Sequence, residues 1–238
     1  MNRLLPNGCR IALACVLSAA ALACAAPKTV KAIYNGYMNG MPIGTITEQF
    51  ESEGDAYRIL SETRPAGLAA LIQRQPLRFS SNGQIARNGL QPALFEARRN
   101  AGDAPQVSAE FDWPRNQLVL KQGGKTESFS LSEGTQDRLS VMYQFTFLTP
   151  ERIRQLEFPM TNGRKLDRYR YRLAGEVEIE TGLGRLKTLH LIKEREPGDT
   201  VSEVWLSPKH RHFPVKMLIV ERDGMHLEQV IQSLEIRD

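Results

Sequence analysis

The chain has 238 residues, of which 41% are hydrophobic and 24% are charged, and its formal net charge is +4. This length is enough for one large β-rich domain or two small ones, so the fold can rely on a buried core. All three cysteines, Cys9, Cys15 and Cys24, lie near the start of the sequence, so we expect a mature chain without disulfide bonds.

The N-terminal stretch has the features of an export signal. Arg3 and Arg10 give it a positive start, and the apolar run 11–23 is shorter than a transmembrane helix needs. Small residues follow the run, as a signal peptidase requires. Export to the cell envelope argues against a nucleic-acid partner.

Two cleavage sites compete at the end of this stretch. Cleavage after Ala25 obeys the small-x-small rule and predicts a signal peptide over 1–25 and a single periplasmic domain over 26–238. A weak lipobox that ends at Cys24 predicts an outer-membrane lipoprotein instead. In that case, membrane contact comes from the lipidated cysteine.

The first half of the remaining chain alternates between apolar and polar residues, as strands with one solvated face do. Asn39-Gly40 predicts one hairpin turn and Asn82-Gly83 predicts another. The clearest alternation is 107–113, which ends on Trp113. Residues 66–72 (AGLAALI) form a short apolar patch that fits either two helical turns or a loop plug.

Residues 135–149 (TQDRLSVMYQFTFLT) differ from the rest, because they read as one helix that is apolar on nearly every side. Thr135 can cap its start, Asp137 suits the positive end of its dipole, and Pro150 ends it. Pro150 also predicts a second, short helix. A helix that is apolar nearly all round is buried, so we expect this one in the core.

The second half returns to strands, in which Tyr169 and Tyr171 alternate with arginines and a run of glutamates follows at 176–180. One interpretation is a solvated strand face whose arginines pair across strands with these glutamates. The other is a basic stripe for anionic groups of lipids or cell-wall polymers. The regular alternation favours the solvated face.

Motifs that carry chemistry are scarce. The sequence has no G-x-S-x-G, H-E-x-x-H or P-loop pattern. His210 and His212 can place two imidazoles on one strand face, as a metal site needs, but Lys209 and Arg211 disfavour a cation. We therefore expect no metal, no cofactor and no catalytic residue.

Several short segments carry a resemblance through their order and spacing. They are Tyr34-Asn35-Gly36 with Ile43-Gly44, Gln136–Ser140 with Tyr143, the turn Gly182–Thr188, and Trp205-Leu206-Ser207 followed by Pro214-Val215-Lys216. Together they resemble the exported bacterial domain-of-unknown-function family three-one-zero-eight, a resemblance that implies no activity. In architecture the chain also looks like the Lol-type periplasmic lipoprotein carriers. This similarity implies a curved, incompletely closed sheet that holds acyl chains on its concave side.

We therefore predict a mainly β fold, in which one strongly curved antiparallel sheet of about a dozen strands, a half-barrel or split barrel, wraps around one central apolar helix. The predicted function is noncatalytic binding or carriage of a lipid or another apolar cell-envelope component. A structural or assembly factor that acts through envelope proteins is the alternative, and an envelope-polymer hydrolase is a weaker one. The expected ligand contacts combine apolar lining residues with arginines at the mouth: Trp113, Leu139, Met142, Phe145, Trp205, Arg168, Arg170 and Arg172.

Overall fold

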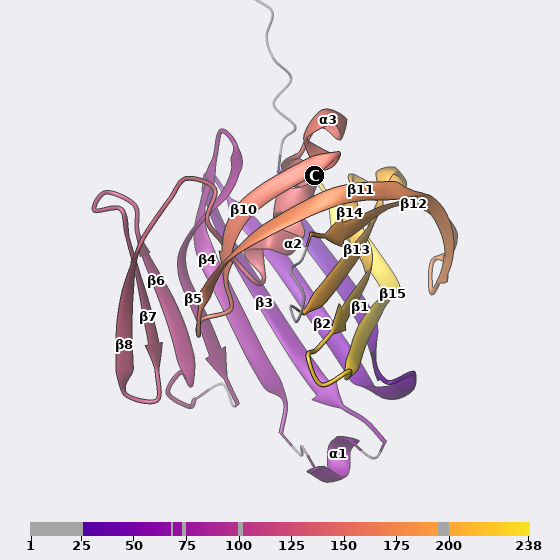
Figure 1. The fold of residues 1–238 in the computed structure, drawn as a ribbon, viewed down its shortest axis with the longest axis horizontal. Coiled ribbons are helices and arrows are strands. Elements are labelled where there is room, and N and C mark those ends of the chain that lie inside the picture. Colours follow the sequence, from indigo (N-terminus) through magenta and orange to yellow (C-terminus); the bar gives the residue numbers. More distant parts are fainter. Residues whose placement is uncertain (1–25, 68, 73–74, 100–101, 195–199) are drawn as a thin grey trace, which may run out of the picture.

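The computed structural model describes residues 26–238 except 68, 73–74, 100–101 and 195–199 (Figure 1). The predicted signal peptide and Cys24 therefore lie outside the described residues. Among the residues that are described, no helix is both long and apolar enough to cross a membrane.

The described strands form one sheet of fifteen, in the order β8-β7-β6-β5-β4-β3-β2-β1-β15-β14-β13-β12-β11-β10-β9. Strands that follow one another in the chain are paired, except β8 and β9, and β1 pairs with β15. All pairs are antiparallel apart from β9 with β10. The predicted mainly β, antiparallel and unclosed sheet is confirmed. The bounds are β1 Thr29–Met38, β2 Met41–Glu53, β3 Ala56–Pro65, β4 Leu77–Ala86, β5 Gly89–Arg98, β6 Val107–Asp112, β7 Gln117–Gln122, β8 Lys125–Ser130, β9 Gln136–Asp137, β10 Gln155–Thr161, β11 Leu166–Thr181, β12 Gly184–Lys193, β13 Val201–Ser207, β14 Phe213–Val220 and β15 His226–Arg237.

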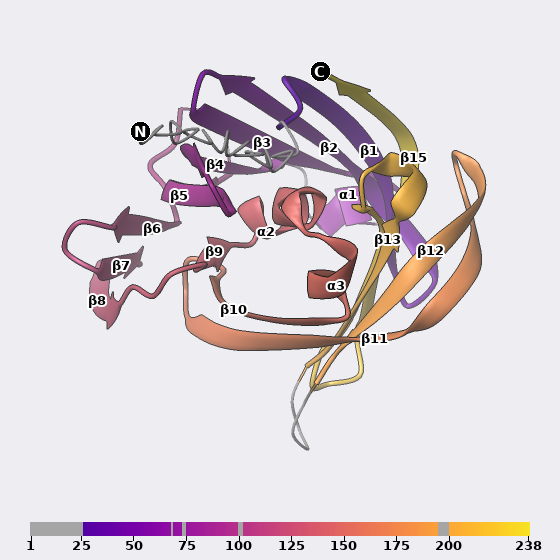
Figure 2. The same ribbon diagram turned by 90° about the horizontal axis from the view of Figure 1, so that it is seen from above.

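The sheet curves so strongly that its two ends approach each other (Figure 2). In this view β1–β5 form one wall, β10 and β11 form the opposite wall, and β6–β8 bend away from the ring. Near Leu90, β5 has no ladder partner on its β6 side. There the Leu90 N–H donates to Gln144 Oε1 at 2.7 Å, and Gln136 Nε2 donates to the Leu90 carbonyl at 2.8 Å. Side chains rather than a strand ladder thus fasten the two ends together, so the barrel does not close.

The long central helix predicted over 135–149 is wrong. α2 (Ser140–Gln144) has only five residues, and a single 3₁₀ turn, η1 (Phe145–Phe147), follows it. The residues predicted to form the first turn of this helix instead form β9, which pairs with β10. Asp137, not Thr135, supports the helix start, because its Oδ1 accepts the N–H groups of Leu139 at 2.8 Å and Ser140 at 2.9 Å.

The remaining helices are short. Pro150 holds Thr149 in an extended conformation and opens α3 (Pro150–Ile153), as predicted for the second helix. α1 (Ala69–Ile72) projects from the lower end of the molecule in Figure 1, and its Leu71 is 70% exposed. The fifth helical segment is the 3₁₀ turn η2 (Pro208–His210).

Two predictions about the strands are also wrong. Asn82-Gly83 is not a hairpin turn but lies inside β4, where the register with β5 shifts between these two residues. Residues 166–181 form one continuous strand, so the arginines of its first half cannot pair across strands with the glutamates at 176–180. In both cases the local sequence fits a turn or a strand equally well, and long-range pairing decides.

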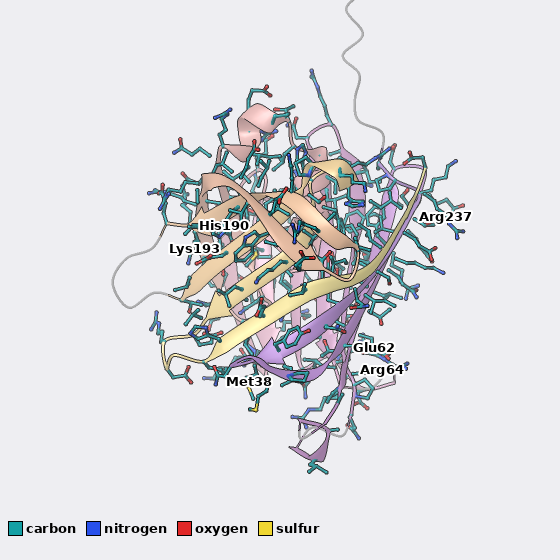
Figure 3. All side chains as sticks on the ribbon, turned by 90° about the vertical axis from the view of Figure 1, so that its right-hand side faces the viewer. Met38, Glu62, Arg64, His190, Lys193 and Arg237 are labelled. Atoms are coloured by element: carbon teal, nitrogen blue, oxygen red, sulfur yellow. The ribbon has the colours of Figure 1, made fainter. Side chains whose placement is uncertain are left out.

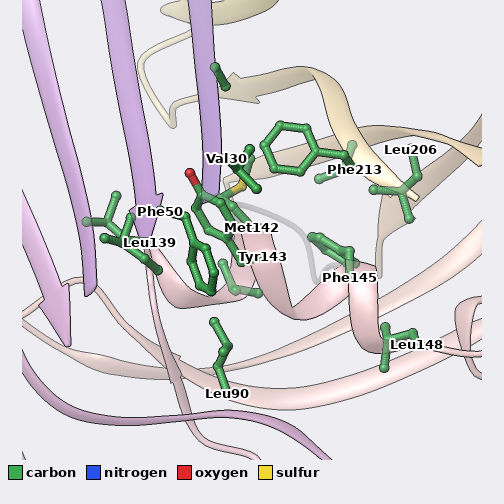
Figure 4. Close-up of a cluster of buried hydrophobic side chains, with 14 of the residues drawn as sticks. Val30, Phe50, Leu90, Leu139, Met142, Tyr143, Phe145, Leu148, Leu206 and Phe213 are labelled. Carbon is green, nitrogen blue, oxygen red and sulfur yellow. The ribbon is translucent and has the colours of Figure 1, made fainter. Parts of the chain in front are cut away.

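The core lies between α2 and the inner, concave face of the sheet (Figure 4). The Phe50 ring stacks on Tyr143 with 4.9 Å between centroids, and Phe213 meets Tyr143 edge-on at 5.5 Å. Leu90 and Leu206 approach the helix from other strands (Figure 4). A helix of five residues is not stable alone, so this packing and the Asp137 cap hold α2 in place.

Candidate functional site

α2 and η1 cover one half of the inner face of the sheet and leave the other half open. Strand register sets the inner residues of neighbouring strands in rows, for example Phe50, Ile59, Ser81 and Phe95 across β2–β5. These four residues are fully buried beneath α2 and η1. Two to four residues further along each strand, towards α1, the helix no longer covers the sheet.

The uncovered half is apolar and partly exposed. Ile46 and Leu77 follow the covered rows on one wall, and Met217, Ile219 and Leu227 follow on the other. Ile219 is 36% exposed. β10 and β11 add Phe158 and Tyr169, which stack at 6.2 Å. We call this set the open inner face; it comprises Ile46, Leu77, Phe79, Phe158, Tyr169, Met217, Ile219 and Leu227.

A buried carboxyl group lies between the covered and open halves. Glu48 points inward between Ile46 and Phe50, and it is only 4% exposed. Its Oε1 accepts a long hydrogen bond of 3.4 Å from Ser61, whereas Oε2 has no hydrogen-bond partner. Burial raises the pKa of Glu48 to about 7, although Arg138 and the hydroxyls of Ser61 and Tyr143 oppose the rise. The Tyr143 hydroxyl also lacks a partner of good hydrogen-bond geometry.

The second buried carboxyl group, Asp137, is fully occupied. Besides the two helix N–H groups, it accepts the Ser81 hydroxyl at 2.6 Å through Oδ2. The Tyr57 hydroxyl lies 3.2 Å from the Ser81 hydroxyl and extends this network. Burial raises the pKa of Asp137, and the hydrogen bonds from Ser81, Ser140 and Leu139 oppose that effect. Asp137 therefore fixes the position of α2, whereas Glu48 keeps an unused acceptor.

Arg138 follows Asp137 and reaches the open inner face. Its guanidinium carbon lies 4.4 Å from the centroid of the Phe79 ring. The side chain is exposed to solvent, yet protein surrounds it closely enough that desolvation lowers its pKa, against the opposing charges of Glu48 and Asp137. Arg138 thus combines contact with an aromatic ring of the open inner face with access to solvent.

The family follows from sequence comparison. The family model for "Protein of unknown function (DUF3108)" matches residues 33–228. The chain belongs to the DUF3108 family. The predicted family is thereby confirmed, and no curated protein matches this DUF3108 chain.

Two solved structures are similar to the DUF3108 chain. One is a proposed lipoprotein from Parabacteroides distasonis with 10% identity and a TM-score of 0.37, and the match covers 88% of this chain and 97% of that chain. The other is a proposed outer membrane lipoprotein-sorting protein domain from Vibrio parahaemolyticus with 12% identity and a TM-score of 0.26, covering 87% and 85% respectively.

Three of the predicted ligand contacts in this DUF3108 protein come from α2 and its flanks. Leu139, Met142 and Phe145 are 3%, 5% and 2% exposed, and they pack against the covered half of the inner face (Figure 4). They lie close to the open half without lining it. Their contact with a ligand stays a prediction.

The two tryptophans lie apart from α2. Trp113 Nε1 donates to the Pro92 carbonyl at 2.6 Å, and its ring stacks on Phe111. Trp205 lies on the outer face of β13, because its neighbours Val204 and Leu206 point inward. Its ring stacks on His190 at 4.3 Å, and Lys216 Nζ lies 5.0 Å from its centroid.

The predicted basic series lies on the outer face of β11 and alternates with the inward tyrosines. Arg168 and Arg170 both pair with Glu157 of β10, at 2.6 and 3.2 Å, and Arg172 is exposed. These three arginines lie close to one another on the outer face. They lie apart from the predicted apolar ligand contacts on and around α2. The solvated-face interpretation is compatible with this placement, although the pairing acid comes from β10.

Ser207 of β13 and His210 of η2 lie close together. Ser207 Oγ lies 2.9 Å from His210 Nδ1, and burial lowers the pKa of His210. Within the described ranges, no group of three or more His, Cys, Asp or Glu side chains could hold a metal ion.

Two solvent-filled hollows lie away from α2. One of about 340 Å³ lies between the β7–β8 hairpin and Arg164, and one of about 430 Å³ lies between the β11–β12 turn and β15. Both are lined largely by polar side chains.

Sequence reasoning missed Glu48 and Arg138. A signal for Glu48 was present, because an acid stands where the alternation of Ile46 and Phe50 demands an apolar residue. No local pattern marks Arg138, because its position depends on β9 replacing the expected helical turn.

Proposed function

We propose that this DUF3108 protein is a noncatalytic binding or carrier protein for a lipid or another apolar component of the cell envelope, acting in the periplasm. The observation that carries this proposal is the open inner face, an apolar surface on the concave side that continues into the core. Soluble proteins rarely leave contiguous apolar surface uncovered unless it binds something.

The energetics of the open inner face suit an acyl chain. Each methylene group removed from water contributes about 0.8 kcal/mol, so eight methylenes supply roughly 6 kcal/mol before the costs of association. The side chains of this face are aliphatic or aromatic, and they come from strands on both walls of the curved sheet. They can therefore contact a narrow chain on two sides.

The test compares two isoleucines of equal exposure on opposite faces. Ile219 on the open inner face is 36% exposed, and Ile33 on the outer face of β1 is 37% exposed. Protein expressed with its export leader is analysed by native mass spectrometry for copurified lipid, and then by displacement of the fluorescent probe N-phenyl-1-naphthylamine by monopalmitoylglycerol. We expect Ile219→Asp to weaken binding roughly tenfold or more, because a carboxylate then borders the chain.

Ile33→Asp serves as the matched control and should bind like the unchanged protein. The proposal fails if the unchanged protein copurifies without lipid and takes up no amphiphile. It also fails if both variants weaken binding equally.

A further inference from the structure

Arg138 is the feature that the apolar surface alone does not explain. It lies between the Glu48 carboxyl group and the open inner face, with its guanidinium group against the Phe79 ring. In the part of the chain that the structure describes, it forms neither an ion pair nor a hydrogen bond. Because Arg138 is exposed, those of its five N–H donors that do not face the ring are solvated in the absence of a ligand.

The acids near Arg138 do not take this role. Asp137 gives both oxygens to α2 and Ser81. Glu48 interacts with Arg138 through its charge, but the two form no ion pair among the described residues. Arg164 adds a second positive charge to the same surroundings. The donors of Arg138 that point away from the ring are therefore available to an anion.

A further cation lies across the open inner face. Lys193 lies at the end of β12 (Figure 3). It follows the buried Leu191 by two residues and so shares the inner face, and its Nζ lies 4.6 Å from the centroid of the Tyr169 ring. Tyr169 is affected by the negative charges of Asp167 and Glu221 as well as by the positive charge of Arg138. Arg138 and Lys193 each place a cation against an aromatic ring of the open inner face.

We propose that the ligand is an anionic amphiphile, an acyl chain with a carboxylate or phosphate head, and that Arg138 binds the head while the chain lies on the open inner face. This inference rests on the proposed function and narrows it to one charge class. The planar guanidinium fork matches carboxylate and phosphate oxygens, which accept two parallel N–H bonds. The chain then extends along Phe79 and Tyr169 towards Ile46 and Met217.

The experiment measures displacement of N-phenyl-1-naphthylamine by four amphiphiles of equal chain length. They are palmitate, hexadecyl phosphate, the neutral monopalmitoylglycerol and the cationic hexadecyltrimethylammonium. For the unchanged protein we expect palmitate, hexadecyl phosphate or both to displace the probe best. Comparing these two shows whether the preferred head is a carboxylate or a phosphate. Arg138→Gln should weaken the anions roughly 10- to 100-fold and leave the neutral compound unchanged, because only charged heads use the guanidinium group.

Two further variants separate the charge from the fold. Arg138→Lys keeps the positive charge and should restore a large part of the anion binding. Arg58→Gln removes an exposed arginine from the outer face of β3 and should bind like the unchanged protein. Thermal unfolding shows whether each variant is folded before its binding is interpreted.

The outcomes distinguish the two proposals. If the protein binds no amphiphile of any charge, the proposed function fails. If the neutral compound binds as tightly as the anions, or Arg138→Gln binds anions normally, the proposed function stands and the assignment to Arg138 is overturned.

Discussion

The buried carboxyl group of Glu48 gives the sharpest prediction about stability. Glu48→Gln replaces it with a neutral group of nearly the same shape on the same inner position of β2. The pKa of Glu48 in the folded protein is about 7, against 4.5 for an unperturbed glutamate. A tenfold change in a proton-binding constant corresponds to about 1.4 kcal/mol, so ionisation of Glu48 costs the folded state about 3 kcal/mol.

The direction in which stability changes with pH follows from proton binding by Glu48 in the folded and unfolded states. Below about pH 4.5, Glu48 is protonated in both states, and the variant and the unchanged protein should be almost equally stable. Between pH 4.5 and 7 the unfolded chain releases its proton while the folded chain keeps it, so the unchanged protein loses stability as the pH rises. Above about pH 7 the advantage of Glu48→Gln should level off at about 3 kcal/mol.

Urea unfolding at a series of pH values measures this difference directly. Other titrating groups contribute to both proteins, so they cancel when the two free energies of unfolding are subtracted. Glu51→Gln on the outer face of β2 is the matched control and should stay within about 0.5 kcal/mol of the unchanged protein. A constant difference between Glu48→Gln and the unchanged protein across this pH range would refute the reasoning.

Substitutions at Asp137 and Gly83 test how the inner elements are held. Asp137→Ala removes the acceptor for Ser81 and two helix N–H groups, so it should lower the free energy of unfolding by about 3 kcal/mol. Asp137→Asn keeps an acceptor and should lower it by roughly 1 kcal/mol. Equal losses for the two variants would contradict the hydrogen-bond account. A Cβ at Gly83 would lie 2.2 Å from the Gln91 carbonyl oxygen, so Gly83→Ala should lower the free energy of unfolding by about 2–3 kcal/mol in urea titrations. Gly124→Ala meets nothing within 4 Å and should cost only the strain of its positive φ, about 1–2 kcal/mol. Similar losses at both glycines would show that the contact with Gln91 is unimportant.

The candidate site was only partly predictable. The predicted apolar ligand contacts were Trp113, Trp205 and three residues of the 135–149 segment, but those three are buried by packing against the sheet. The open inner face comes from strand residues such as Ile46 and Met217, which have no distinguishing local pattern. Their exposure depends on how far α2 extends across the sheet, and that depends on where the helix stops.

By itself, the sequence determined the elements whose information is local. Alternation with a period of two sets which side chains of a strand face inward, so Tyr169 and Tyr171 are correctly separated from the arginines between them. The turn at Asn39-Gly40 is also as predicted, because glycine accepts the positive φ that this turn needs.

Only the tertiary structure decided the features that depend on distant partners. Asn82-Gly83 became a bulge because β5 continues past it, and residues 136–137 became a strand because β10 pairs with them. The pairing of β1 with β15 joins the two halves of the chain into one sheet, and the side-chain links to Leu90 bring β9 and α2 beside β5. Local sequence preferences are worth less free energy than these long-range contacts, so the contacts determine both the short helix and the part of the inner face that it leaves open.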